Sequence, residues 1–343
     1  MQGGRAVGEG PSTTEADVVM LDAATGTELW ARALGSDEMA GRSTTAAPVF
    51  VGDEVWASWY GDRYDPAAGL TCAGGIERLD VATGTSGVPV TRDWVALVMV
   101  PFGDGVAQVV DSSQEQCIGA SERPVQVVDT ATGAVRWQTD DGIRPLIVDD
   151  ELVQPGPNGV PEGYDLDGCG AARCDPAWTI DVETPRLSAG GDGRLFGLDW
   201  DPTTGTDRLT AMDRPTRTVS WRWTLPRRDS QGIAVTSDVV YVSSAQDVMA
   251  FPAAGCGAAT CPPLWRGRVA GRSTAVPIVA GDLVWTGSLT GAVQAFPAAG
   301  CGTARCQPLV TLQVGSPVTH VLVSGGRVLA VTATGTVAFG RGT

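Results

Sequence analysis

The chain has 343 residues, and 39 acidic residues against 24 basic ones give a formal net charge of −15. Such a charge repels phosphate backbones and anionic lipid surfaces, which argues against nucleic acid or a membrane surface as a partner. The single histidine, His320, excludes metal sites built from several histidines and weakens any serine–histidine mechanism. No apolar run approaches the roughly 18 residues of a spanning helix, so we expect no direct membrane insertion.

A β-hairpin signature is the first element along the chain. VVMLDAATGTELW, from Val18, joins an alternating apolar strand to a second apolar strand through a D-x-x-T-G turn. IERLDVATGTSGV, from Ile76, and VQVVDTATGAVRW, from Val125, repeat the signature. Hairpins recur at intervals of about 36 to 58 residues, near the range of propeller blades. They lie near Leu21, Leu79, Val128, Tyr164, Met212, Phe251, Phe296 and Phe339.

Further pairs of short apolar strands lie between the hairpins. They begin at Ser43, Arg144, Ser273 and Gly315, and each contains an acidic or glycine turn. Together with the hairpins they make units of four antiparallel strands, A to D. Stacking such units radially buries both faces of every sheet and protects the edges. The sequence therefore predicts an all-β fold, a β-propeller of four-stranded antiparallel blades, as a single domain over residues 1–343.

The two ends of the chain decide the expected number of blades. GGRAVGEG, from Gly3, matches a strand B, so the first unit starts at B, and the last unit ends after strand C at TVAFG. We expect eight blades, the first and last incomplete, with seven as the alternative if the terminal units share one blade. The missing strands D and A are expected upstream of Met1, together with an export signal or membrane anchor.

Eight cysteines are the most specific chemical signal in the chain. Three C-G-x-x-x-C pairs lie where the hairpin turn is longer: Cys169 with Cys174, Cys256 with Cys261, and Cys301 with Cys306. Each pair lies at a different hairpin tip, which disfavours zinc and predicts local disulfides that fix the tip. Cys72 and Cys117, in long B-to-C loops of consecutive units, are expected to form a fourth bridge. Full pairing predicts an oxidising, extracytoplasmic compartment.

The hairpin signature in VVMLDAATGTELW and VQVVDTATGAVRW resembles the repeat of the PQQ-like β-propeller family, which includes quinoproteins and BamB-like propellers. The resemblance covers nearly the whole chain. It implies that a strand-D tryptophan docks between neighbouring blades. The implied docking residues are Trp30, Trp137, Trp178, Trp221 and Trp265. The units ending near Val88 and Val310 lack such a tryptophan.

The same resemblance raises the hypothesis of a quinone-dependent dehydrogenase. Those enzymes are typified by an adjacent Cys-Cys disulfide, calcium ligands and an aspartate base, and no Cys-Cys occurs in this chain. Asp22, Asp80 and Asp129 precede Thr-Gly, where an aspartate side chain bonds the turn backbone. The aspartates of DLDG (from Asp165) and DWDPTTGTD (from Asp199) are faintly calcium-like but lack the spacing of a full calcium loop. We expect no catalytic residue, no metal and no cofactor.

One candidate binding face follows from the loops. In a propeller the B-to-C and D-to-A loops emerge on the same side, and the long insertions of this chain occupy that side. WASWYGDRYDP places Trp59, Tyr60, Arg63 and Tyr64 in one such region, and these residue types dominate interface hot spots. The alternative is that Trp59 and Tyr60 belong to strand B and pack inward.

The sequence thus favours a non-catalytic, extracytoplasmic propeller, secreted or on the cell surface, that acts as a protein-binding scaffold or sensor. Its expected partner is an unidentified cell-envelope protein or extracellular ligand, and we expect a monomer. The all-arginine, alanine-rich composition suggests a GC-rich bacterial genome. A PQQ-dependent quinoprotein dehydrogenase is one alternative. A calcium- or carbohydrate-binding module is the other.

Overall fold

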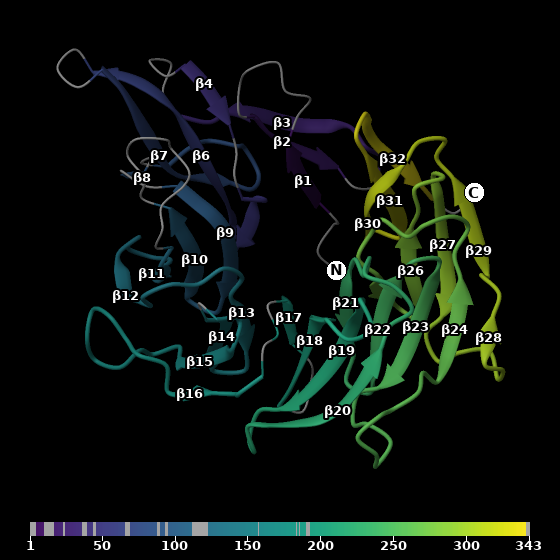
Figure 1. The fold of residues 1–343 in the computed structure, drawn as a ribbon. Coiled ribbons are helices and arrows are strands. Elements are labelled where there is room, and N and C mark those ends of the chain that lie inside the picture. Colours follow the sequence, from purple (N-terminus) through teal and green to yellow (C-terminus); the bar gives the residue numbers. More distant parts are fainter. Residues whose placement is uncertain are drawn as a thin grey trace. The chain divides into compact units, whose positions relative to one another are not determined.

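The computed structural model describes residues 5–9, 17–22, 25–35, 40–43, 46–65, 69–87, 90–92, 95–111, 123–156, 158–182, 184, 186–189 and 193–340. The chain divides into two compact units, unit 1 (residues 1–157 and 162–178) and unit 2 (residues 158–161 and 179–343). Figure 1 labels their strands. Among the described residues no helix is long and apolar enough to cross a membrane. That residues 1–343 form a single domain stays a prediction.

Unit 1 contains four sheets, in which strands adjacent in sequence lie side by side, except that β4 and β5 of the second sheet both pair with β6. The first has three strands, β1 (Arg5–Glu9), β2 (Asp17–Asp22) and β3 (Glu28–Ala33). The second has β4 (Ala40–Ser43), β5 (Val49–Val51), β6 (Glu54–Asp65), β7 (Gly69–Asp80) and β8 (Val90–Arg92). The third has β9 (Val95–Phe102), β10 (Gly105–Asp111), β11 (Val125–Asp129) and β12 (Val135–Gln138). The fourth has β13 (Leu146–Val148), β14 (Glu151–Pro155), β15 (Pro161–Asp165) and β16 (Trp178–Thr179).

Unit 2 contains four more sheets. The first has β17 (Arg186–Ala189), β18 (Arg194–Asp201), β19 (Thr206–Asp213) and β20 (Thr218–Thr224). The second has β21 (Gly232–Val235), β22 (Val239–Ser244), β23 (Asp247–Pro252), β24 (Trp265–Arg268) and, at its edge, β28 (Arg305–Cys306). The third has β25 (Ile278–Ala280), β26 (Leu283–Gly287), β27 (Ala292–Pro297) and β29 (Val310–Gln313). The last has β30 (Val318–Ser324), β31 (Arg327–Thr332) and β32 (Gly335–Phe339).

These sheets confirm an all-β propeller class with four-stranded antiparallel blades. Six sheets have four or five strands, and the first and last have three each, as the sequence predicts for the two ends. The preference for eight blades is not borne out, and seven blades is the alternative given by the sequence.

The D-x-x-T-G turn is held by its own side chains. The Thr132 amide and hydroxyl both donate to Asp129 Oδ1, each at 2.8 Å, and Gly133 adopts φ 71°. The same pattern links Asp22 with Thr25, Asp80 with Thr83, and Asp213 with Thr216. The repeated aspartates therefore serve the turn backbone, as their structural interpretation predicts.

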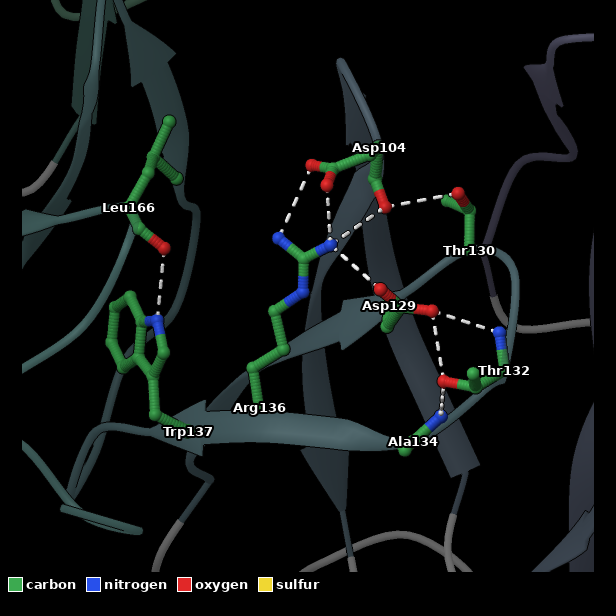
Figure 2. A network of polar contacts seen from close by, with 8 residues as sticks. All are labelled: Asp104, Asp129, Thr130, Thr132, Ala134, Arg136, Trp137 and Leu166. Atoms are coloured by element: carbon green, nitrogen blue, oxygen red, sulfur yellow. Dashed lines mark hydrogen bonds and ion pairs between the residues drawn. The ribbon is translucent and has the colours of Figure 1, made fainter. Parts of the chain in front are cut away.

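Four of the five predicted docking tryptophans reach the following sheet. A Cβ built on Gly84, in the turn after β7, would lie 2.6 Å from the Trp30 ring, whose Nε1–H donates to the Val81 carbonyl at 3.1 Å. Trp137 meets the turn that contains Gly168 and donates to the Leu166 carbonyl at 3.0 Å (Figure 2). Trp221 and Trp265 pack in the same way against Gly255 and Gly300. Each indole thus needs a residue without a side chain in the next turn.

Trp178 differs from the other docking tryptophans. Its Nε1–H donates to Glu151 Oε1 at 2.9 Å, and its ring covers Gly163, so the contacts described for it lie in its own sheet. In the C-to-D turn of the next sheet along the sequence, Arg217, at φ 57°, stands where the repeat has glycine. The sheet that follows β16 belongs to unit 2, so the docking role of Trp178 stays a prediction.

The three C-G-x-x-x-C pairs are disulfides, with Cα–Cα distances of 5.6–5.7 Å. Their expected role at the hairpin tip alone is wrong. The second half of each bridged segment pairs in parallel with strand D of the preceding sheet. The pairs are Gln138 with Arg173, Arg222 with Thr260, and Arg266 with Arg305.

These bridged segments therefore act as clamps between neighbouring blades. The Arg222 amide donates to the Ala259 carbonyl at 2.8 Å, and the Arg266 amide to the Ala304 carbonyl at 2.9 Å. The second cysteine of each pair is buried with a docking tryptophan in a shared core, for example Cys261 with Trp221. The clamp also covers a strand edge that would otherwise lack a partner.

The predicted bridge between Cys72 and Cys117 stays a prediction. Cys117 lies outside the described residues. Cys72 lies in β7, opposite Asp62 of β6, and its side chain is also outside them.

Candidate functional site

The binding face predicted around Trp59 needs a correction. The segment is not a loop, because β6 pairs with β7 without interruption from Glu54 opposite Asp80 to Asp65 opposite Gly69. The Trp59 side chain is 2% exposed and belongs to a core cluster with Val18 and Met20. Since its ring points into the core, Trp59 cannot contribute to a surface, and the alternative of inward packing holds for it.

The other residues of that predicted face are less buried or not described. Tyr60 is half-buried on β6. Arg63 and Tyr64 follow on the same strand, and their side chains lie outside the described residues. The binding role of these three residues stays a prediction.

The calcium-like aspartates of β18 and β19 have partners within the protein. Asp199 accepts from Arg208 Nε at 3.0 Å, and Asp201 accepts from the Thr203 amide at 2.9 Å. Asp207 pairs with Arg186 at 3.2 Å. Because each carboxylate is used by a different donor, the structural interpretation of DWDPTTGTD accounts for them. In DLDG, Asp165 likewise accepts from the Asp167 amide at 2.8 Å.

Another polar cluster lies at the turns of the third sheet (Figure 2). Arg136 donates to Asp104 and Asp129, each with a shortest distance of 2.7 Å, and so ties the A-to-B turn to the C-to-D turn. The Arg136 guanidinium, assisted by Thr132, holds the pKa of the Asp129 carboxyl well below its usual range. This network fastens two turns of one blade.

A distinct surface forms on the loop 225–231 of unit 2, which connects β20 with β21. Buried Asp207 fixes the loop, because its side chain accepts the Ser230 amide at 2.9 Å and its backbone amide donates to the Arg227 carbonyl at 3.2 Å. Arg186 adds a hydrogen bond to the Ser230 carbonyl at 3.1 Å. The loop is therefore held in one shape while its arginines face solvent.

Arg228 of this loop lies over an exposed indole. The Arg228 guanidinium carbon is 4.8 Å from the centre of the Trp200 ring, and Trp200 is 48% exposed. Trp200 is forced outward because it alternates with the buried Asp199 and Asp201 along β18. A tryptophan and an arginine paired on a rigid surface are the residue types that carry interface energy.

Arg227, the preceding residue, lines a pocket of about 370 Å³. Its lining comprises Pro226, Arg227, Asp229, Ala245, Gln246, Asp247, Arg268 and Arg272. Asp229 anchors the pocket by accepting the Ala245 amide at 2.8 Å and pairing with Arg272 at 3.2 Å. We call this pocket with Trp200 and Arg228 the arginine surface.

Sequence reasoning missed the arginine surface. The only available signal was the run PRRD from Pro226 beside a D-to-A position, because Trp200 was read as part of a calcium-like turn. Alternation around Trp200 could have shown that it and the aspartates face opposite sides. Which face of the strand is exposed to water depends on Arg208 and Arg186, the ion-pair partners of the buried aspartates. Alternation does not reveal these partners.

Comparisons with known proteins agree on the fold. Residues 6–139 match the family model described as outer membrane protein assembly factor BamB, which confirms the resemblance to PQQ-like, BamB-like repeats. BamB from Moraxella catarrhalis superposes with a TM-score of 0.63 at 17% identity, covering 96% of this chain and 95% of that chain. No curated protein matches the chain.

Two further solved structures show the same fold. The computationally designed Ika8 protein gives a TM-score of 0.65 at 14% identity and covers 98% of this chain and 96% of its own. The Dos1 propeller gives 0.64 at 10% identity, with 97% and 87% covered. At such identities the likeness concerns the propeller fold alone.

Proposed function

We propose that this propeller with BamB-like repeats is a non-catalytic, extracytoplasmic scaffold or sensor module that binds another protein through its arginine surface. The observation that carries the proposal is the exposed Trp200 beneath Arg228, beside a pocket lined by arginines. Such a pair offers a large apolar area and directed donors on a loop that is already ordered, which lowers the entropy cost of binding.

The disulfides and the relatives support the location and the class. Structural disulfides are typical of oxidising compartments and rare in the cytosol, so the three bridges favour a place outside the cytoplasm. The matched relatives include a factor named for outer membrane protein assembly, which makes a protein partner in the cell envelope a reasonable expectation. The turn aspartates have structural uses, so we assign none of them a catalytic role.

Capture from the native cell envelope tests the proposal. The intact chain is used as bait beside Trp200→Ala and Arg228→Ala, and Leu322→Ala is the control, because Leu322 is also 48% exposed. We expect one envelope protein to be retained by the wild type and the control and lost from both surface variants. Equal retention by all four baits would contradict the proposed surface. Quinone- and calcium-dependent turnover by the purified chain would contradict the non-catalytic role.

A further inference from the structure

The pocket of the arginine surface concentrates positive charge in an acidic protein. Arg227, Arg268 and Arg272 line one cavity of about 370 Å³, in a chain with net charge −15. Cavities that bind ligands begin at roughly 300 Å³. Two acidic residues also line the cavity, so its chemistry depends on which charges remain available.

Asp229 is already neutralised within the protein. Its side chain is 12% exposed and takes a guanidinium contact from Arg272 and a hydrogen bond from the Ala245 amide. Ala245 adopts φ 55°, which few residues without glycine's freedom adopt, so the turn that aims this amide is held by its surroundings. Arg272 and Asp229 therefore form one wall of the pocket.

Two arginines remain for a ligand. Arg268 donates only to the neutral Gln246 Oε1, at 2.8 Å, so its charge has no carboxylate partner among the described residues. The Arg227 guanidinium likewise has no ion pair in the described part of the chain, while its backbone carbonyl is fixed by Asp207. Against these two charges stands the single carboxylate of Asp247. A net positive pocket with two guanidinium groups that lack a carboxylate partner suits an anion.

We propose that the pocket binds carboxylate side chains of an acidic peptide segment, while Trp200 with Arg228 takes a neighbouring apolar side chain. Guanidinium forks match carboxylates with two parallel hydrogen bonds. An exposed indole beside them adds an apolar contact that a free inorganic anion cannot use. Nucleic acid is disfavoured because the rest of the chain is strongly acidic. This inference rests on the proposed function and names the chemistry of the partner.

Fluorescence anisotropy with a defined probe tests the inference. The probe is a labelled peptide with four glutamates flanking one leucine, and the control peptide has glutamines in their place. We expect the glutamate peptide to bind the full chain and the glutamine peptide to bind at least ten-fold more weakly, with affinity falling as salt rises. Equal binding of both peptides, or none of the glutamate peptide, would overturn the inference.

Variants locate the binding. Arg227→Ala and Arg268→Ala should each weaken binding about ten-fold, the effect of losing roughly one charge-assisted hydrogen bond. Arg305→Ala, an exposed arginine of β28 outside the pocket, should leave it unchanged. Thermal melting confirms that each variant is folded, and Arg227→Lys replaces any variant that is not. If Arg305→Ala weakens peptide binding equally, the effect comes from the overall charge of the protein, and the peptide does not bind in the pocket.

Two outcomes separate this inference from the proposed function. If inorganic phosphate at the peptide's concentration displaces the peptide, the pocket is a general anion site and the peptide assignment is wrong. If the peptide fails to bind but the chain still captures an envelope protein through Trp200, the proposed function stands without this partner chemistry.

Discussion

At the scale of single residues, the contact between a docking tryptophan and the glycine of the next turn explains why the repeat keeps both. The glycine provides a positive φ and also the room for the indole. The bridged turns separate these two demands, because each contains one glycine under a tryptophan and another in open space. Gly300 lies under Trp265, whereas Gly302, at a similar φ of 77°, has nothing within 4 Å of a built Cβ.

Gly300→Ala and Gly302→Ala should therefore differ in stability. Gly302→Ala adds only the strain of a left-handed residue, about 1–2 kcal/mol. Gly300→Ala adds the same strain and also a Cβ 2.6 Å from the Trp265 ring. That clash should lower the free energy of unfolding by a further ~1–3 kcal/mol. Denaturant unfolding measures both. Equal losses would show that the indole contributes nothing to the choice of glycine.

Lowering the pH should weaken the turn network of Figure 2, because Asp129 accepts its hydrogen bonds as a carboxylate. Its folded pKa is lowered, first by Arg136 and then by Thr132, so its contribution to stability is present above the unfolded value of about 3.9. That contribution is lost as pH falls through the lowered folded pKa. In Arg136→Gln we expect the Asp129 carboxyl to titrate at higher pH by carbon-detected NMR. If the Asp129 carboxyl titrates at the same pH in this variant, Arg136 is not the main cause of its lowered pKa.

At the scale of elements, the clamps change what a cysteine-bridged hairpin does. A short disulfide loop by itself contributes only about 2 kcal/mol through chain entropy. Here the bridged segment also forms hydrogen bonds with strand D of another blade, to Arg222 in one case and to Arg266 in another. The disulfide therefore holds an edge strand in place as well as its own tip.

Removing one clamp should expose one identified amide. In Cys256→Ala with Cys261→Ala, the Arg222 amide should exchange hydrogen at least ten-fold faster, while the Arg266 amide stays protected. In Cys301→Ala with Cys306→Ala the two responses should be reversed. Each double variant is thus the control of the other. If hydrogen exchange becomes faster only at amides inside the bridged tip, the disulfide fixes the tip alone and does not hold the neighbouring strand.

Most of the hairpins and turns could be predicted from the sequence. Alternation and the D-x-x-T-G turn predicted the hairpins because both are local, and the side-chain bonds of Asp129 with Thr132 form within the turn itself. Pairing between Arg266 and Arg305 was not predictable, since it joins segments about forty residues apart through backbone atoms. The hairpin of β6 and β7 was missed because its polar, aromatic outer half does not alternate like a buried strand.

At the scale of the whole molecule, the residues that build the blades differ from those of the arginine surface. Turns, docking tryptophans and clamps build the blades, and none of them needs Trp200 or the arginines beside it. The exposed pair therefore has no evident use in folding. A surface of Trp200 and Arg228 on a loop fixed by Asp207 is the kind of site on which a partner's binding energy concentrates.

Site-specific photo-cross-linking in the native cell envelope tests that claim most directly. A photoreactive amino acid replaces Trp200 in one protein and Leu322 in another, two side chains of equal 48% exposure in unit 2. We expect one discrete protein adduct from the Trp200 position, reduced by Arg228→Ala, and none above background from the Leu322 position. Adducts of equal yield at both positions, or none at Trp200, would contradict it.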